Sequence, residues 1–322
     1  MVILDKAKSY MESRILLTGA ELDIFTLIGK KINRAEEIAK KTNADLRSLT
    51  RLLDALAVSG FLEKDGLVYS LAKGCESLSS EHPKSVLPMV LHINDIWNDW
   101  HHLTKTVIQG KKQSKAPYPD MHEKDREAFI YGMHVAGREL SSDIAADLDL
   151  SSYKKLLDIG GASGTYTIAF LEKNSQMKGI IFDLSEVIPM SKKGIDSAGL
   201  NERVEFISGD FYLNELPKGC DLALLSAIIH QNSPKENLAL YSKIYKVLEP
   251  GGMLVIRDHI MDKSRTYPPD GAVFAINMLV GTNGGDTYTF EEVKSALEKA
   301  GFKDVTFARK GEKMDCLVTC KK

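Results

Sequence analysis

Cysteine is scarce in this sequence, and its spacing excludes the common cysteine-based sites. The 322 residues include four cysteines, at positions 75, 220, 316 and 320, and no Cys-x-x-Cys or zinc-type spacing joins them. Cys316 and Cys320 fall on one predicted strand, where a rise of about 3.3 Å per residue keeps their Cα atoms too far apart for a disulfide. We therefore expect reduced thiols and no cysteine-bound metal.

Long apolar runs and a strong charge imbalance are also missing. No stretch reaches the roughly 18 apolar residues that span a bilayer, and the start MVILDKAKSYMESR lacks the basic beginning and long apolar core of a signal peptide. The net charge is −2 with 27% charged residues, which indicates neither nucleic acid nor a membrane as partner. We expect a cytoplasmic protein with two domains or one large one.

The most informative stretch is KLLDIGGASG, residues 155–164. It predicts a short apolar strand that runs into a glycine turn and then into an amphipathic helix, residues 165–172. Glycines let the backbone approach a ligand closely, and the helix start offers unpaired N–H groups. Ala162 and Thr165 stand where a dinucleotide fingerprint needs glycine, and no Gly-Lys-Ser/Thr follows. Neither a dinucleotide site nor a Walker loop therefore fits.

The acidic residue before the glycines narrows the ligand class. The pattern that remains is Asp158-x-Gly160-Gly161-x-x-Gly164. A carboxylate in that place would repel a pyrophosphate but suits a ligand that carries a cationic amine. Asp183 ends the next predicted strand, 19 residues after Gly164, where a carboxylate can accept both hydroxyls of a ribose.

From residue 153 onward, strand and helix patterns alternate, which predicts a parallel sheet with helices on both faces. The strands are expected at 155–159, 179–183, 203–207, 221–225, 252–258, 303–308 and 314–319. Such sheets bind ligands at the carboxyl ends of their strands. We therefore expect one crevice to collect the polar residues at or just beyond these ends, namely Asp158, Asp183, Asp210, Ser226 to His230 and Asp258.

Residues 1 to about 80 predict small helices followed by a hairpin. An apolar face covers residues 16–28, and Asn33 is expected to cap the helix 35–41, with Glu36 completing a capping box. A leucine stripe predicts a helix over 45–59 that ends at Gly60. Two strands, 61–63 and 67–70, joined by Lys-Asp-Gly with a D-G turn, complete a winged-helix pattern.

A winged helix raises the question of DNA binding. Positions 1–70 hold eleven Lys or Arg against ten Asp or Glu, a net charge of +1. The expected recognition helix carries Arg47 and Arg51 but also Asp45 and Asp54, whereas a phosphate-binding face should be clearly basic. We therefore expect this domain to dimerise or to cover a substrate site.

Residues 81–150 predict two longer helices around a loop. The first, about 84–109, carries both tryptophans and three histidines, and the second, about 125–148, carries the run FIYGMH. None of the histidines has HExxH-type spacing, so packing or pocket lining is favoured over a metal site. The stretch 111–120, with Pro117 and Pro119 on either side of Tyr118, is expected to be the least structured part.

The motifs resemble those of class I S-adenosylmethionine-dependent methyltransferases. Nearly end to end, the chain is similar to the O-methyltransferases related to caffeic acid and hydroxyindole O-methyltransferases of plants, and to their bacterial counterparts. The blocks that carry the resemblance are LLDIGGASG, IIFDLSEVI, RVEFISGDF, AIIHQNSPKEN, LEPGGMLVIRDHI, NMLVGTNGGDTYTFEEVKSALEKAGF and, earlier, AFIYGM.

The resemblance implies an α/β fold in three parts. A mostly α winged-helix dimerisation domain would occupy residues 1–100, and connecting helices that line the acceptor pocket would occupy 101–145. A Rossmann-like methyltransferase domain with a mainly parallel, doubly wound sheet would occupy 146–322. The implied partners are a small-molecule acceptor and a second copy of the chain, with no nucleic acid and no membrane.

The resemblance also implies roles for individual residues, without a metal. S-adenosyl-L-methionine, released as S-adenosyl-L-homocysteine, would be held by Asp158, Gly160, Gly161, Gly164, Asp183, Leu184, Gly209, Asp210, Phe211 and Ser226. Candidates for the acceptor pocket are Trp97, Met133, His134, Phe274, Asn277 and Met278. His230 occupies the place of the general base, and Asp258 that of the acidic residue that orients it.

The sequence departs from the family pattern next to the histidine. Gln231 replaces the usual Asp, Asp258 is shorter than the usual Glu, and Thr287 stands where a second flanking Glu is common. With one carboxylate in place of two, His230 would be a weaker base. Three functions therefore stay open: methylation of a small-molecule, aromatic hydroxyl; methylation of a thiol or carboxylate, or non-methylating chemistry with the same cofactor; and a cofactor-sensing regulator that binds DNA.

Overall fold

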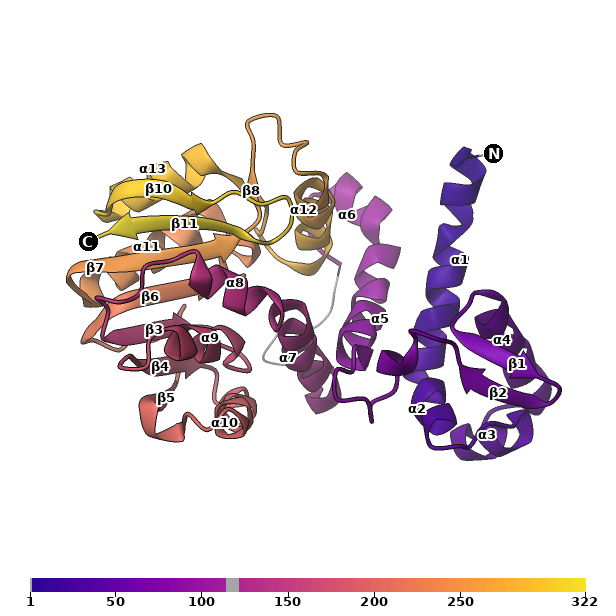
Figure 1. The fold of residues 1–322 in the computed structure, drawn as a ribbon. Helices are drawn as coiled ribbons and strands as arrows, with labels where there is room; N and C mark the ends of the chain where they lie inside the picture. Colours follow the sequence, from indigo (N-terminus) through magenta and orange to yellow (C-terminus); the bar gives the residue numbers. More distant parts are fainter. Residues whose placement is uncertain (1, 114–121) are drawn as a thin grey trace. The chain divides into compact units, whose positions relative to one another are not determined.

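The computed structural model describes residues 2–113 and 122–322, so most of the stretch expected to lack structure lies outside the described residues. The chain divides into two compact units, Met1–Asn98 with Ala116–Val135 and Asp99–Lys115 with Ala136–Lys322 (Figure 1). The division into 1–100, 101–145 and 146–322 stays a prediction. Within the described ranges, no helix has the length and apolar character needed to cross a membrane.

The first unit begins with four helices, a hairpin and a short 3-10 helix. These are α1 (Val2–Glu21), α2 (Ile24–Gly29), α3 (Ala35–Thr42), α4 (Leu46–Val58), β1 (Leu62–Asp65), β2 (Val68–Leu71) and η1 (Glu76–Leu78). Asp45 caps α4, since its side chain accepts from the Ser48 N–H at 2.9 Å. The apolar stripes of α2, α3 and α4 meet in one core, where Phe25, Ile38 and Leu53 are fully buried.

Two local predictions for this unit are wrong. The N-cap of α3 is Arg34, whose side chain makes no capping hydrogen bond. The preceding Asn33 has its carbonyl oxygen engaged by the Tyr69 N–H at 2.9 Å, so pairing with the hairpin sets the start of this helix. The turn of the hairpin consists of Gly66 and Leu67, one residue later than predicted, because Asp65 still pairs with Val68.

Both long helices predicted for the middle of the chain are interrupted. α5 (Leu87–His101) and α6 (Leu103–Gln109) stand in place of the first, and α7 (Glu123–Gly137) and α8 (Leu140–Ala146) in place of the second. α7 ends at Gly137, where the lack of a side chain lets Tyr166 pack close: a Cβ there would lie 3.1 Å from Cε2 of Tyr166.

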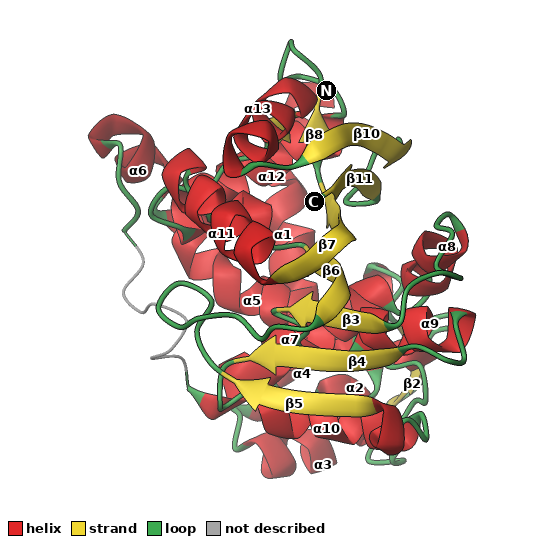
Figure 2. Cartoon of the chain, turned by 90° about the vertical axis from the view of Figure 1, so that its left-hand side faces the viewer, coloured by secondary structure: helices red, strands yellow, loops and turns green. Residues whose placement is uncertain are grey.

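The second unit is built on seven strands in the order β10-β11-β7-β6-β3-β4-β5, seen from top to bottom in Figure 2. They are β3 (Lys155–Ile159), β4 (Lys178–Asp183), β5 (Val204–Ser208), β6 (Cys220–Ser226), β7 (Leu248–Asp258), β10 (Lys303–Arg309) and β11 (Cys316–Lys321). β3 to β7 pair in parallel, and β11 runs antiparallel to both of its neighbours. The predicted mainly parallel sheet is confirmed, and each strand lies within four residues of its predicted bounds.

Helices cover both faces of this sheet. They are α8, α9 (Thr165–Lys173), α10 (Ile188–Ser197), α11 (Pro234–Val247) and α13 (Phe290–Ala300). α12 (Pro269–Gly281) contacts α6 and two short elements, β8 (Ile260–Met261) and η4 (Ile229–Gln231). The other short elements are η3 (Asn201–Arg203) and β9 (Tyr288–Thr289). Side chains alternate between the faces. Leu156, Leu224 and Val255 pack with α8, α9 and α10, whereas Leu157, Leu225 and Ile256 pack with α11 and α13.

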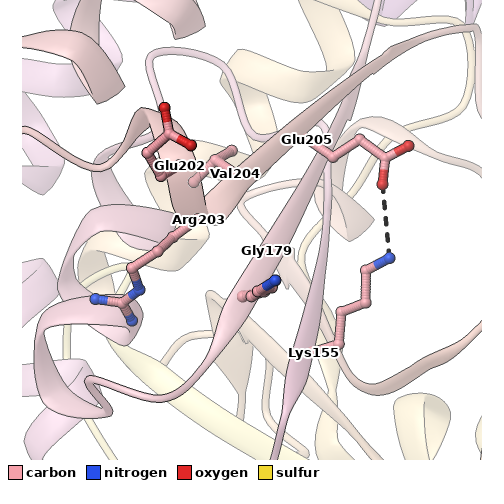
Figure 3. A pocket seen from close by; sticks show the side chains of 7 residues that line it. Lys155, Gly179, Glu202, Arg203, Val204 and Glu205 are labelled. Atoms are coloured by element: carbon pink, nitrogen blue, oxygen red, sulfur yellow. Dashed lines mark ion pairs between the residues drawn. The ribbon is translucent and has the colours of Figure 1, made fainter.

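The order of the strands fixes where a ligand can bind. The chain passes from β3 to β4 and β5 on one side of β3 and then returns to β6 on its other side. This reversal lies at the carboxyl ends of β3 and β6, the place where open α/β sheets bind ligands. The surface hollow in Figure 3, about 290 Å³, lies at the opposite edge, because Lys155, Lys178 and Val204 in its lining are the first residues of their strands.

Candidate active site

The glycine turn after β3 is a tight loop that is already fixed by internal contacts. Gly160 and Gly164 have φ angles of 71° and 79°, which side-chain-bearing residues rarely adopt. Ala162 between them also has a positive φ, 49°, and its N–H donates to Oδ2 of Asp183 at 2.8 Å. The end of β4 therefore holds the loop in one shape.

Asp158 lies beneath this loop. It is only 1% exposed, it accepts from the Thr167 hydroxyl on α9 at 2.6 Å, and a Cβ at Gly161 would lie 3.0 Å from its Cγ. Burial raises the pKa of the Asp158 carboxyl to about 7; the Thr167 hydrogen bond opposes this rise and the charge of Asp183 adds to it. The carboxyl therefore fastens the loop to α9 from below.

Asp183 ends β4 on the same face of the sheet. Its Oδ2 accepts from the Ala162 N–H and its Oδ1 from the Leu184 N–H, both at 2.8 Å. Burial raises the pKa of Asp183 to about 6, against the effect of these two hydrogen bonds. Each carboxylate oxygen has two lone pairs, so each keeps one acceptor position for a hydroxyl.

The segment after β5 brings an aromatic ring to the same loop. The Gly209 N–H donates to the Asp183 carbonyl at 2.8 Å, and Oδ1 of Asp210 accepts from the Tyr212 N–H at 2.7 Å. A Cβ at Gly160 would lie 3.7 Å from Cε1 of Phe211. The ring of Phe211 therefore stands beside the glycine turn.

His230 and Asp258 form a buried pair at the same edge of the sheet. His230 lies on η4, directly after β6, and its Nδ1 is 2.8 Å and 3.0 Å from the two oxygens of Asp258. Asp258 is fully buried and His230 is 9% exposed. Burial alone would raise the pKa of Asp258, but the imidazole and the nearby Arg257 hold that pKa below its usual value. An ionised carboxylate that accepts from Nδ1–H leaves the lone pair of the imidazole on Nε2.

Backbone contacts fix the segment that carries His230. The Asp286 N–H donates to the His230 carbonyl at 2.9 Å, and Nδ2 of Asn237 donates to the Ile229 carbonyl at 2.9 Å. The hydroxyl of Tyr288 donates to the Asn232 carbonyl. The imidazole is therefore held through its backbone as well as through Asp258.

Thr287 is 2% exposed, and its hydroxyl donates to the Gly271 carbonyl at 3.3 Å. Among the contacts of the described residues, Asp258 is the carboxylate that bonds to His230. The ring of Phe274 packs edge-on against His230, with centroids 4.9 Å apart.

The six residues expected to contact the acceptor are divided between the two units. Phe274, Asn277 and Met278 lie on α12 in the second unit, and Trp97, Met133 and His134 lie on α5 and α7 in the first. Phe274 reaches His230 directly. Asn277 accepts from the Trp100 indole N–H at 2.8 Å, and Met278 is 7% exposed.

Three side chains at the crevice were not predicted from the sequence: Thr167, Arg257 and His259. Nε of Arg257 donates to the Ser226 hydroxyl at 2.8 Å. The His259 N–H donates to Oδ1 of Asp258 at 2.8 Å, and its ring packs against Phe274 with centroids 4.9 Å apart. The signal for the last two was their position on either side of Asp258 at the carboxyl end of β7, where such sheets bind ligands.

Comparison with known proteins links this geometry to one family. The O-methyltransferase domain model matches residues 100–303, and the O-methyltransferase dimerisation domain model matches residues 4–81. The chain is 26% identical to the tetracenomycin polyketide synthesis 8-O-methyl transferase TcmO of Streptomyces glaucescens, over 94% of this chain and 91% of that protein. It is 27% identical to acetylserotonin O-methyltransferase of Gallus gallus, over 98% of this chain and 96% of that protein.

A solved structure shares the fold. Human N-acetylserotonin methyltransferase in complex with SAM superimposes with a TM-score of 0.86 at 23% identity, over 100% of this chain and 96% of that one. Together with the seven-stranded sheet, this places the second unit in the methyltransferase fold.

Proposed function

The chain belongs to the O-methyltransferase family, and from this premise we propose that it methylates an aromatic hydroxyl of a small molecule with His230 as general base. The observation that carries the proposal is the buried pair of His230 and Asp258, with Nδ1 and Oδ1 2.8 Å apart at the edge of the sheet where the crevice lies.

The crevice fits the adenosine part of S-adenosylmethionine. Asp183 keeps an acceptor position on each oxygen for the two ribose hydroxyls, and Phe211 offers a flat apolar surface beside the glycine turn. When bound, the cofactor supplies a methyl group that its sulfonium activates. We assign the cofactor to Gly160, Gly161, Gly164, Asp183, Leu184, Gly209, Asp210, Phe211 and Ser226, whereas Asp158 supports the glycine turn from beneath through Thr167.

His230 performs the proton step. Its Nε2 would accept the hydroxyl proton of the acceptor, and Asp258 would stabilise the imidazolium that forms. Both side chains are buried, which strengthens their attraction. Because Thr287 contributes a hydroxyl rather than a carboxylate, a single carboxylate supports the base. This favours an acceptor with an acidic hydroxyl, such as a phenol with a pKa of about 10.

The acceptor pocket and the assembly follow the same premise. Trp97, Met133, His134, Phe274, Asn277 and Met278 are assigned to the acceptor, and the thioethers of the two methionines suit a flat ring. The match of residues 4–81 to a dimerisation domain supports a homodimer.

The test is transfer of isotope-labelled methyl from S-adenosylmethionine to a panel of phenols, catechols, hydroxyquinones, hydroxy acids and thiols. We expect label on a phenol, with the rate about two to four decades lower in His230→Ala. His82→Ala, which changes a histidine in the loop after η1, serves as the matched control and should keep the wild-type rate. Equal rates in wild type and His230→Ala would exclude His230 as the base. Label on thiols alone would favour the thiol alternative.

A further inference from the structure

Arg257 is a buried cation that forms no ion pair with any acidic residue that the structure describes. It is 7% exposed; its Nε donates to the Ser226 hydroxyl at 2.8 Å and its Nη1 to the Met314 carbonyl at 2.7 Å. The guanidinium carbon lies 4.8 Å from the centre of the Tyr166 ring. All of these partners are neutral. The carboxylate of Asp258 acts on Arg257 through space, but its direct partner is His230. Taking a charge out of water without a directly paired counter-charge is costly, so this environment suits a bound anion.

The nearest carboxylates are engaged elsewhere. Asp258, the next residue along the chain, packs on the opposite face of the sheet and bonds to His230. Asp315 pairs with Arg309 at 3.4 Å. Across residues 2–113 and 122–322, no ion pair includes Arg257. Its Nη2 donates to Sδ of Met314 at 3.6 Å, and a thioether is a weak acceptor.

Tyr166 adds a second polar group that lacks a partner. It is 8% exposed, and within the described part of the chain its hydroxyl has no partner with hydrogen-bonding geometry. Burial raises the pKa of this phenol, against the effects of Arg257 and of the Ser226 hydroxyl beside it, so the hydroxyl remains a neutral donor. Tyr166 is the second residue of α9, directly after the glycine turn. A buried hydroxyl and a guanidinium side by side are donors that suit the oxygens of a carboxylate.

The strand order determines which end of the cofactor reaches these donors. Asp183 ends β4 on one side of β3. On the other side, Ser226 ends β6 and Arg257 is the last residue but one of β7. Ser226 and Arg257 are register partners, and the neighbours Leu224 and Val255 place both on the face that carries α9. A ligand with its ribose on Asp183 therefore extends across the glycine turn toward Arg257. In S-adenosylmethionine this other end is an amino acid.

We propose that Arg257 and Tyr166 bind the α-carboxylate of the cofactor, with Ser226 holding the guanidinium in place. The inference rests on the proposed cofactor site and extends it to the amino-acid end. The planar fork of Arg257 offers N–H groups to the carboxylate oxygens, and the Tyr166 hydroxyl donates one more hydrogen bond. Arg257 is a binding residue and takes no part in the proton step.

Titration calorimetry on the full-length chain tests the proposal with two ligands. S-adenosylhomocysteine carries the carboxylate, whereas 5′-methylthioadenosine keeps the adenosine and the thioether but lacks the amino acid. We expect Arg257→Gln to weaken S-adenosylhomocysteine binding about 10- to 100-fold and to change 5′-methylthioadenosine binding less than about twofold. Tyr166→Phe keeps the ring and should weaken the first ligand several-fold without affecting the second. Arg51→Gln, at an exposed position of the first unit, should change neither.

Each outcome decides a separate point. Equal S-adenosylhomocysteine affinity in the wild type and a folded Arg257→Gln would overturn the inference and leave the proposed function standing. If Arg257→Gln weakens the binding of both ligands equally, Arg257 has a structural role, and the inference is overturned as well. If wild type binds neither ligand, the proposed cofactor site itself fails. If Arg257→Gln does not fold, the ratio of the two affinities in Tyr166→Phe decides.

Discussion

Asp158→Asn is expected to remove a pH dependence of folding stability that the wild type carries. In the folded protein, burial and the charge of Asp183 raise the pKa of this carboxyl from 3.8 to about 7. Between these two values the folded state keeps a proton that the unfolded chain has lost. The stability contribution of Asp158 is therefore fully present below about pH 4 and declines as the pH rises toward 7.

The magnitude follows from the same two values. Each pKa unit corresponds to about 1.4 kcal/mol, so the full decline amounts to about 4 kcal/mol. Roughly 2 kcal/mol of it falls between pH 5 and pH 7. The asparagine side chain has no such titration, and its carbonyl oxygen can accept the hydrogen bond that Thr167 donates to Oδ2 at 2.6 Å.

The assay is urea unfolding of the ligand-free protein at pH 5, 6, 7 and 8. We expect the free energy of unfolding of Asp158→Asn, relative to wild type, to rise by about 3 kcal/mol from pH 5 to pH 8. Asp183→Asn is the comparison. Its free energy of unfolding, relative to wild type, should also rise with pH but should level off nearer pH 6, since the pKa of Asp183 is about 6. If the free energies of unfolding of Asp158→Asn and wild type differ by the same amount from pH 5 to pH 8, the carboxyl of Asp158 is not neutral in the folded protein and the reasoning is refuted.

Three further predictions concern the base and the glycine turn. Asp258→Asn should lower kcat of methyl transfer about 10- to 100-fold with little change in KM, because the amide cannot stabilise the imidazolium. Steady-state kinetics measure both constants, and Asp304→Asn, at an exposed position, is the control that should keep the wild-type values. Gly160→Ala should lower the free energy of unfolding by about 1–2 kcal/mol, because φ is 71° and the new Cβ meets Cδ1 of Ile228 at 2.7 Å. In melting experiments Ile228→Val should restore only part of that loss. Tyr288→Phe should lower kcat and leave S-adenosylhomocysteine affinity unchanged, and an unaltered kcat would contradict a positioning role for its bond to the Asn232 carbonyl.

Local patterns in the sequence predicted the architecture of the second unit. Apolar runs, glycine turns and amphipathic helices are properties of neighbouring residues, and they located the strand 155–159 and the turn that follows it. The resemblance to the O-methyltransferases, carried by such blocks, is confirmed by the two family models. The residue roles that came with the resemblance stay predictions.

The predicted helix boundaries were wrong where a residue distant in the sequence makes a contact that the local sequence pattern does not reveal. Asn33 has the side chain of a good cap, but pairing of its carbonyl with the Tyr69 N–H extends the backbone there. The predicted helix over 125–148 has no proline to stop it, yet α7 ends at Gly137, where Tyr166 packs close. Neither contact can be inferred from nearby residues.

The sequence by itself determined which residues end the strands, because the period of two and the apolar runs are written into each segment. Only the tertiary structure decided what those residues meet. The Asp158 carboxyl accepts a hydrogen bond from Thr167, and the Asp258 carboxyl bonds to His230. The Arg257 guanidinium donates to Ser226 and lies over the Tyr166 ring. These contacts depend on strand order and register, which bring together residues that lie 9 to 91 positions apart in the chain.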